Sequence, residues 1–144
     1  MTSPLLVTAA VIVQDGRVLL ARRRPGDHQG GCWEFPGGKL HAAEDPAAGL
    51  AREIREELAV EVDVLSPLTF IYWEYPEKQI LLLFYLSRIR SGVPQPVECA
   101  AVEWFDAAAL ARLSLAAADR AVLPVVLPLL TGEHFVPGGG EPAE

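Results

Sequence analysis

The chain has 144 residues, of which 51% are hydrophobic, and this composition suits one domain with a hydrophobic core and excludes global disorder. The formal net charge of −7 argues against binding to a nucleic acid polymer, because such proteins present a basic surface to the phosphates. Two cysteines without a metal-type spacing indicate neither a zinc site nor a disulfide framework.

The apolar segments do not predict a membrane partner. No Lys or Arg precedes the first apolar run, residues 5–13, so the chain lacks the charged start of a signal peptide. The next apolar run, residues 121–130, is too short to span a bilayer and contains Pro124 and Pro128. We therefore expect a cytoplasmic protein.

Strands dominate the expected secondary structure. The segments predicted as strands are residues 5–13, 17–21, 33–35, 60–64, 68–74, 79–88 and 101–105. The pair Asp15-Gly16 predicts a hairpin turn between the first two strands. Polar residues and glycines predict loops at 22–31 and 91–100.

The clearest helix is predicted to begin at Pro46. Asp45 is a favoured N-cap residue, and proline is favoured at the first helical position. One apolar stripe about 100° wide should face the core. Its members are Ala47, Leu50, Ala51, Ile54 and Leu58.

Two further helices are expected near the C-terminal end. Asp106 can cap a helix over residues 107–113, and Asp119 can cap a second one that runs to about residue 130. Pro124 and Pro128 should shorten or kink that second helix. The pattern predicts an α+β domain at residues 1–132, with a mixed sheet between helices, and a flexible C-terminal tail at 133–144.

Three glutamates on the first helix form a candidate metal site. Glu53, Glu56 and Glu57 project from one arc, where like charges repel. A solvated acidic face is the common explanation of such a pattern. Here the acids border the apolar stripe, and the helix follows a Pro-Gly-Gly turn that lets backbone approach a ligand. Clustered carboxylates are typical ligands of hard divalent cations.

The same segment resembles a known family. Gly38, Glu44 and the run Arg52-Glu53-Ile54-Arg55-Glu56-Glu57-Leu58-Ala59-Val60 are similar to the Nudix box, with Ala59 standing where that family has Gly. The stretch Trp33-Glu34-Phe35-Pro36-Gly37-Gly38-Lys39 resembles the MutT branch, whose members hydrolyse nucleoside triphosphates including 8-oxo-dGTP. The resemblance extends from about residue 7 to residue 126.

The resemblance implies a fold, a cofactor and a mechanism. The fold is an α/β/α sandwich, and the cofactor is Mg²⁺, with Mn²⁺ as a substitute. The implied metal ligands are the Gly37 carbonyl, Glu53, Glu56, Glu57 and Glu98. Arg52 is implied to orient a glutamate, while Glu53 or Glu98 acts on the attacking water. The implied products are a nucleoside monophosphate and pyrophosphate.

The resemblance also implies residues that bind a small nucleotide. Those on the substrate side are Arg23, His28, Phe35, Gly38, Lys39 and Asp119. Arg23 and Lys39 would clamp phosphates, and Phe35 would form a wall against the base. Plainer explanations stay open: Arg23 can be solvated, His28 can be a loop residue, and Phe35 can belong to the core.

Asp119 is the residue on which the predicted base preference depends. An ionised carboxylate only accepts hydrogen bonds, and guanine offers two adjacent donors. A protonated Asp119 gains a donor and relaxes that preference. The competing interpretation is the helix N-cap described above.

Other functions remain compatible with these residues. Within the family, modified cytosine nucleotides or dinucleoside polyphosphates are alternative substrates. A non-catalytic nucleotide-binding module is the alternative from another class, although every acid of the box is present. The sequence leaves the choice between monomer and dimer open.

Overall fold

The computed structural model describes residues 3–132, and its centre is a seven-stranded mixed sheet. The strands are β1 (Leu5–Gln14), β2 (Arg17–Arg22), β3 (Trp33–Glu34), β4 (Gly37–Lys39), β5 (Glu61–Tyr75), β6 (Lys78–Ser91) and β7 (Ala101–Phe105). The helices are α1 (Pro46–Leu58), α2 (Ala107–Ala111), α3 (Ala117–Arg120) and α4 (Leu123–Thr131).

The sheet is organised around β1. Its strand order is β3-β2-β1-β6-β5, with β4 paired to β1 and β7 paired to β2. Only the β1–β6 pairing is parallel, and the remaining pairs are antiparallel. The predicted mixed sheet is therefore confirmed. Among residues 3–132 no helix is long and apolar enough to cross a membrane.

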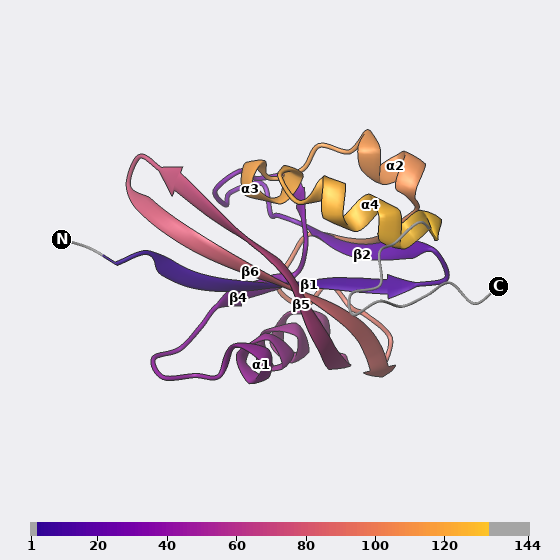
Figure 1. Cartoon of the computed structure of the whole chain (residues 1–144), viewed down its shortest axis with the longest axis horizontal. Helices are drawn as coiled ribbons and strands as arrows, with labels where there is room; N and C mark the ends of the chain where they lie inside the picture. The colour runs from indigo at the N-terminus through magenta and orange to yellow at the C-terminus, as the bar shows by residue number, and fades with distance from the viewer. Residues whose placement is uncertain (1–2, 133–144) are drawn as a thin grey trace, which may run out of the picture.

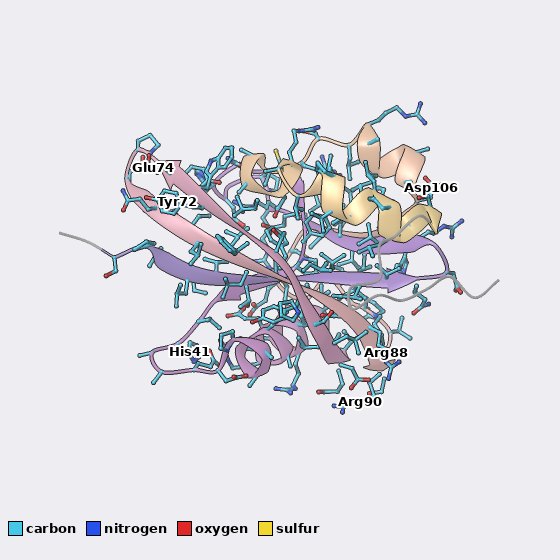
Figure 2. The ribbon with its side chains drawn as sticks, viewed as in Figure 1. His41, Tyr72, Glu74, Arg88, Arg90 and Asp106 are labelled. Atoms are coloured by element: carbon cyan, nitrogen blue, oxygen red, sulfur yellow. The ribbon has the colours of Figure 1, made fainter. Side chains whose placement is uncertain are left out.

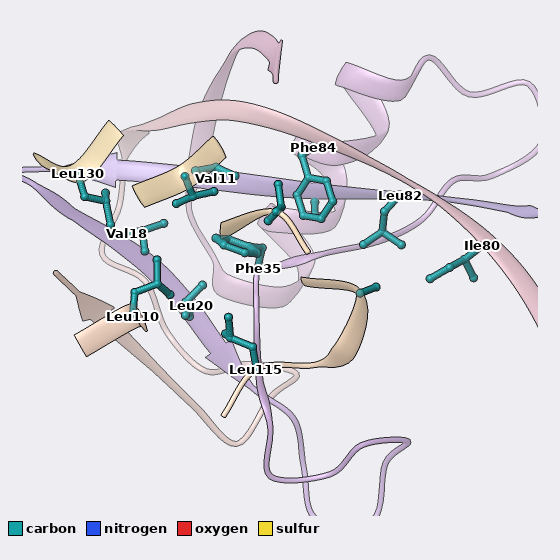
Figure 3. Close-up of a cluster of buried hydrophobic side chains, with 14 residues drawn as sticks. Val11, Val18, Leu20, Phe35, Ile80, Leu82, Phe84, Leu110, Leu115 and Leu130 are labelled. Atoms are coloured by element: carbon teal, nitrogen blue, oxygen red, sulfur yellow. The ribbon is translucent and has the colours of Figure 1, made fainter. Parts of the chain in front are cut away.

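Helices cover both faces of the sheet. In Figure 1, α1 lies below the sheet, and α2, α3 and α4 lie above it. The α1 face holds a buried cluster that includes Ile12, Leu50 and Ile54. The opposite face holds a second cluster around Phe35 and Phe84, whose rings meet edge to face (Figure 3). The α+β sandwich expected from the sequence is thus confirmed.

The strands follow the predictions closely, with two differences. The hairpin turn forms at Asp15 and Gly16, both with positive φ. The segments predicted as two strands at 60–64 and 68–74 are one long strand, β5, because register shifts near Ser66 and Pro67 carry the pairing through. The third predicted strand is shorter than expected, and β4 follows it after one turn at Pro36.

The C-terminal helices depart further from expectation. Asp106 caps α2 as predicted, since its Oδ1 accepts from the N–H of Ala109 at 2.9 Å (Figure 2). The prediction that Asp119 caps a long helix is wrong, because Asp119 lies inside the four-residue α3. A separate helix, α4, has Pro124 in its first turn, where a missing N–H does no harm. The predicted tail at 133–144 lies outside the described residues.

The C-cap of α1 is strained. Ala59 adopts φ 60° and ψ 34°, and its N–H bonds to the carbonyl of Arg55 at 3.0 Å. This left-handed conformation favours glycine, because the Cβ of any other residue approaches the following carbonyl. The departure of Ala59 from the box pattern therefore carries a conformational cost.

We predict that Ala59→Gly stabilises the protein. Removing the Cβ at a left-handed cap should raise the free energy of unfolding by about 1 kcal/mol, measured by urea denaturation. Ala48→Gly is the matched control: Ala48 is exposed within α1, where glycine should lower stability by up to about 1 kcal/mol. Equal effects of the two substitutions would contradict this account of the cap.

Candidate active site

The start and the buried face of α1 fix where its acids point. Asp45 caps the helix by accepting from the N–H of Ala48 at 2.9 Å, as predicted. Leu50, Ile54 and Leu58 are fully buried against the sheet. The glutamates consequently lie along the border of the buried stripe, next to β4 and the loop that follows β6.

Arg52 joins three of the acids. Its guanidinium contacts Glu44 at 2.7 Å, Glu53 at 3.2 Å and Glu56 at 3.1 Å. The hydrogen bonds from Arg52, and then one from the backbone of His41, lower the pKa of Glu44 to about 2. Glu44 is therefore a fixed anion that anchors Arg52, and Arg52 in turn holds Glu53 and Glu56 in place.

Two glycines bring the backbone of β4 against β1 and α1. A Cβ on Gly37 would collide with the carbonyl of Thr8, and a Cβ on Gly38 would collide with the carboxylate of Glu53. The Gly37 N–H donates to Glu57 Oε1 at 3.2 Å. The Pro-Gly-Gly turn thus delivers main-chain groups directly to the acids of the helix.

Glu57 is a buried acid without a cationic partner among the described residues. Burial first, and then the neighbouring Glu34, Glu53 and Glu98, raise its pKa to about 8, against a hydrogen bond from Gly37 that lowers it. The pKa of Glu53 is also raised, first by burial. Such a group of carboxylates stores repulsion that a bound cation would remove.

The loop that carries Glu98 is fastened to the end of α1. The N–H groups of Val97 and Glu98 donate to the carbonyl of Glu57, and Gln95 donates to Leu58. Arg24 donates to the Val97 carbonyl at 3.2 Å. The exposed Glu98 consequently lies close enough to raise the pKa values of Glu53 and Glu57, as its predicted role requires.

The donor set suits a hard divalent cation. The carboxylate of Glu57 lies at Gly37 and that of Glu53 at Gly38, with Glu56 and Glu98 carried nearby on α1 and on the loop fastened to its end. Oxygen ligands are what Mg²⁺ and Mn²⁺ prefer. Over residues 3–132, no three His, Cys, Asp or Glu side chains are already spaced to hold an ion. Arg52 explains this spacing in part, because it pairs with Glu53 and Glu56.

A pocket of about 250 Å³ opens beside these acids. Its walls come from β1, β4, β6, α3 and the loop after β2. All predicted substrate-side residues line it: Arg23, His28, Phe35, Gly38, Lys39 and Asp119. The structure therefore brings these six residues together around one pocket.

The individual positions refine the predicted roles. Arg23 pairs with Glu34 at 2.8 Å and donates to the carbonyl of His28 at 2.7 Å, so its partly exposed guanidinium already has two protein partners. His28 packs edge-on against Tyr75. Phe35 is 3% exposed and belongs both to the core and to the pocket wall. Lys39 is exposed at the pocket.

Asp119 is buried in the pocket, with 4% of its surface exposed. Burial raises its pKa well above the usual value, and Glu34 adds to the shift against Arg23 and the backbone of Phe35. The burial therefore shifts Asp119 towards its protonated form. That form has both a donor and an acceptor, whereas the ionised form has only the acceptors that would select guanine.

Three of the titratable residues that line the pocket were not predicted as site residues. Glu34, Tyr75 and Lys78 line the pocket. Glu34 could have been predicted from the sequence, because an acid within an apolar strand beside a Pro-Gly-Gly segment is unusual in a purely structural element. Tyr75 and Lys78 lie at the end of the β5–β6 hairpin, and only the fold brings that end to the pocket.

Known proteins resemble this chain in sequence and in fold. The NUDIX domain matches residues 4–126. An 8-oxo-dGTP diphosphatase of Proteus vulgaris is 39% identical over 81 residues, covering 56% of this chain and 72% of the relative. A CTP pyrophosphohydrolase of Escherichia coli strain K12 is 48% identical over 58 residues, covering 40% of this chain and 43% of the relative.

A solved structure agrees with these relatives. The crystal structure of a MutT NUDIX hydrolase from Burkholderia pseudomallei aligns with a TM-score of 0.80 at 32% identity, covering 87% of this chain and 99% of that chain. The fold and the acidic site are those of a hydrolase that acts on pyrophosphate bonds. The chain belongs to the Nudix hydrolase family, whose members generally need a divalent metal ion and act on small nucleotides.

The burial of Glu57 predicts a pH-dependent stability. Its pKa rises from 4.5 to about 8 on folding. The protonated Glu57 therefore contributes its full amount to the free energy of unfolding below pH 4.5, and this contribution is lost as the pH rises through 8. Glu57→Gln keeps an oxygen for the Gly37 N–H and removes the charge. In EDTA we expect this variant to be more stable than the wild type at pH 8 and similar to it near pH 4.5.

Urea denaturation at both pH values measures this difference. Added Mg²⁺ serves as the control, because it should stabilise the wild type and have little effect on Glu57→Gln. A stability difference that does not change with pH would contradict the buried charge.

Proposed function

We propose that the chain is a Mg²⁺-dependent nucleoside triphosphate pyrophosphohydrolase that releases a nucleoside monophosphate and pyrophosphate, with 8-oxo-dGTP among its substrates. One observation carries the proposal: the pocket that buries Asp119 opens beside Gly37 and Gly38, and these glycines contact the acids of α1. A base in the pocket therefore leaves the phosphates next to the carboxylates. The 8-oxo-dGTP diphosphatase among the relatives supports the same substrate.

The cation and the side chains would have different roles in the hydrolysis. A bound Mg²⁺ neutralises phosphate charge and lowers the pKa of a water molecule. Glu53, Glu56, Glu57 and Glu98, with the Gly37 carbonyl, would hold it. Arg52 keeps Glu53 oriented through the 3.2 Å contact between them. Glu53 or Glu98 would accept the proton of the attacking water at a carboxylate oxygen.

Lys39 is the better candidate of the two predicted phosphate clamps. It is exposed beside Gly38, where the pocket meets the acids. Arg23 instead neutralises Glu34 at 2.8 Å and ties the loop at His28. We therefore assign Arg23 to shaping the base pocket and Lys39 to the phosphates.

A protonated Asp119 supports a second candidate substrate class. Its O–H and carbonyl can pair with O6 and N7–H of 8-oxoguanine, and they match N3 and the amino group of cytosine equally well. The CTP pyrophosphohydrolase relative favours this cytosine alternative. Pyrophosphate release from a panel of oxidised, modified and canonical nucleotides, with and without Mg²⁺, tests both candidates. Absence of release from every nucleotide would refute the proposal.

We predict that Glu98→Gln lowers kcat/KM at least tenfold, or about 1.4 kcal/mol of barrier. The reason is the position of Glu98 against the end of α1, where it acts electrostatically on Glu53 and Glu57. Glu53→Gln is the reference for complete loss, since it should abolish turnover while the melting temperature stays close to wild type. Unchanged kcat/KM in Glu98→Gln would leave Glu98 as a solvated loop acid.

We predict that Asp119→Ala raises KM for the preferred nucleotide about tenfold and flattens the preference among bases. Asp119→Asn keeps a donor and an acceptor at the same place, so its KM should stay within roughly threefold of wild type if Asp119 binds in its protonated form. KM values from the nucleotide panel measure both effects. If Asn behaves like Ala, Asp119 binds as the carboxylate and guanine selectivity regains support.

A further inference from the structure

Gln29 connects three segments that line the pocket. Its Oε1 accepts a 3.1 Å hydrogen bond from the N–H of Ala117, 88 residues further along the chain. Its side chain also lies close enough to the hydroxyl of Tyr75, at the end of β5, to lower the pKa of that group against the burial that raises it. The preceding residue, His28, packs against the Tyr75 ring at 4.8 Å between centroids. The loop after β2, the β5–β6 hairpin and α3 therefore meet at Gln29.

The contact with Ala117 replaces a missing helix cap. The helix α3 has only four residues, and its N-cap residue, Ala116, provides no side-chain acceptor. A helix this short cannot satisfy its own N–H groups. Gln29 supplies an acceptor at the first residue of α3, two positions before Asp119. The position of Asp119 in the pocket thus depends on a side chain from a distant loop.

The backbone conformation of Gln29 costs free energy that a glycine at this position would not cost. Gln29 adopts φ 55°, a left-handed conformation in which residues with a Cβ are strained. Glycine would take this conformation freely, and the same loop already contains Gly26, Gly30 and Gly31. Backbone strain clusters at functional positions, and here it occurs at a residue whose side chain holds the helix that carries Asp119.

Other contacts hold the backbone on either side. The N–H of Ala116 donates to the carbonyl of Trp33 at 2.9 Å, and the Arg23 guanidinium donates to the carbonyl of His28. These bonds do not involve the Gln29 side chain, so they should persist when it is removed. Its loss should loosen α3 without unfolding the domain.

We infer that Gln29 is a positioning residue for base recognition, which holds α3 and Asp119 in the pocket through Ala117 and orders the opposite wall through Tyr75. Gln29 does not need to touch the substrate for this role. The kinetic part of the inference rests on the proposed function, and the structural part does not.

Three variants separate the contacts of Gln29 from its backbone. Gln29→Gly removes the hydrogen bond to Ala117 and relieves the strained φ. Gln29→Glu keeps an acceptor for the N–H of Ala117 but places a carboxylate, in place of the amide, near Tyr75. Asp27→Gly is the matched control, because it adds a glycine to the same loop at an exposed residue that does not line the pocket.

Amide hydrogen exchange tests the structural part without any substrate. In Gln29→Gly the Ala117 amide should exchange roughly tenfold faster, because it loses its acceptor. In Gln29→Glu and Asp27→Gly its exchange should match the wild type. Unchanged protection of Ala117 in Gln29→Gly overturns the inference.

Kinetics on the preferred nucleotide test the consequence for recognition. Gln29→Gly should raise KM roughly tenfold and leave kcat within about twofold, with Gln29→Glu between it and the wild type. An unchanged KM, or an equal rise in Asp27→Gly, overturns the inference while the proposed function stands. A wild type that hydrolyses no nucleotide refutes the proposed function instead, and the exchange of Ala117 still decides whether Gln29 holds α3.

Discussion

The site depends on the close approach of the Gly37-Gly38 backbone to β1 and α1. A side chain at Gly37 would meet the rigid backbone of Thr8 and Ala9 in β1, and one at Gly38 would meet the carboxylate of Glu53 on α1. The close approach also aims the Gly37 N–H at Glu57. A larger residue at Gly37 would therefore push β4 away from β1, and one at Gly38 would displace the Glu53 carboxylate within the acid cluster.

Two arginines divide the acids into paired and unpaired groups. Arg52 pairs with Glu44, Glu53 and Glu56, whereas Arg23 pairs with Glu34. Across residues 3–132, Glu57, Glu98 and Asp119 have no ion pair. The burial of an unpaired carboxyl group is costly, and here it occurs at Asp119 in the pocket and at Glu57 beside Gly37. Such costs are typical of positions kept for binding rather than for stability.

Local signals predicted much of this molecule, and long-range contacts account for what they missed. Asp45, Asp106 and the apolar stripe of α1 act within a few residues of their own positions, so the sequence was sufficient to place them. Asp119 was misread as a cap because the proline at 124 starts a new helix and leaves α3 to a cap 88 residues away. Likewise, the β5 segments merge because pairing with β6 continues through the irregular region. Such partners are invisible to a local pattern.

The short segment from Trp33 to Gly38 joins recognition to chemistry. Its first part is fixed to the α3 region, because the Trp33 backbone bonds with Ser114 and Ala116. Its last part is fixed to α1 through Glu57. In the proposed function, one stretch of backbone therefore sets the distance between a base held at Asp119 and phosphates held beside Gly38. A change in the length of this stretch would move the base pocket and would also change which phosphate bond lies next to the acids. Base recognition and the choice of the cleaved bond therefore depend on the same segment.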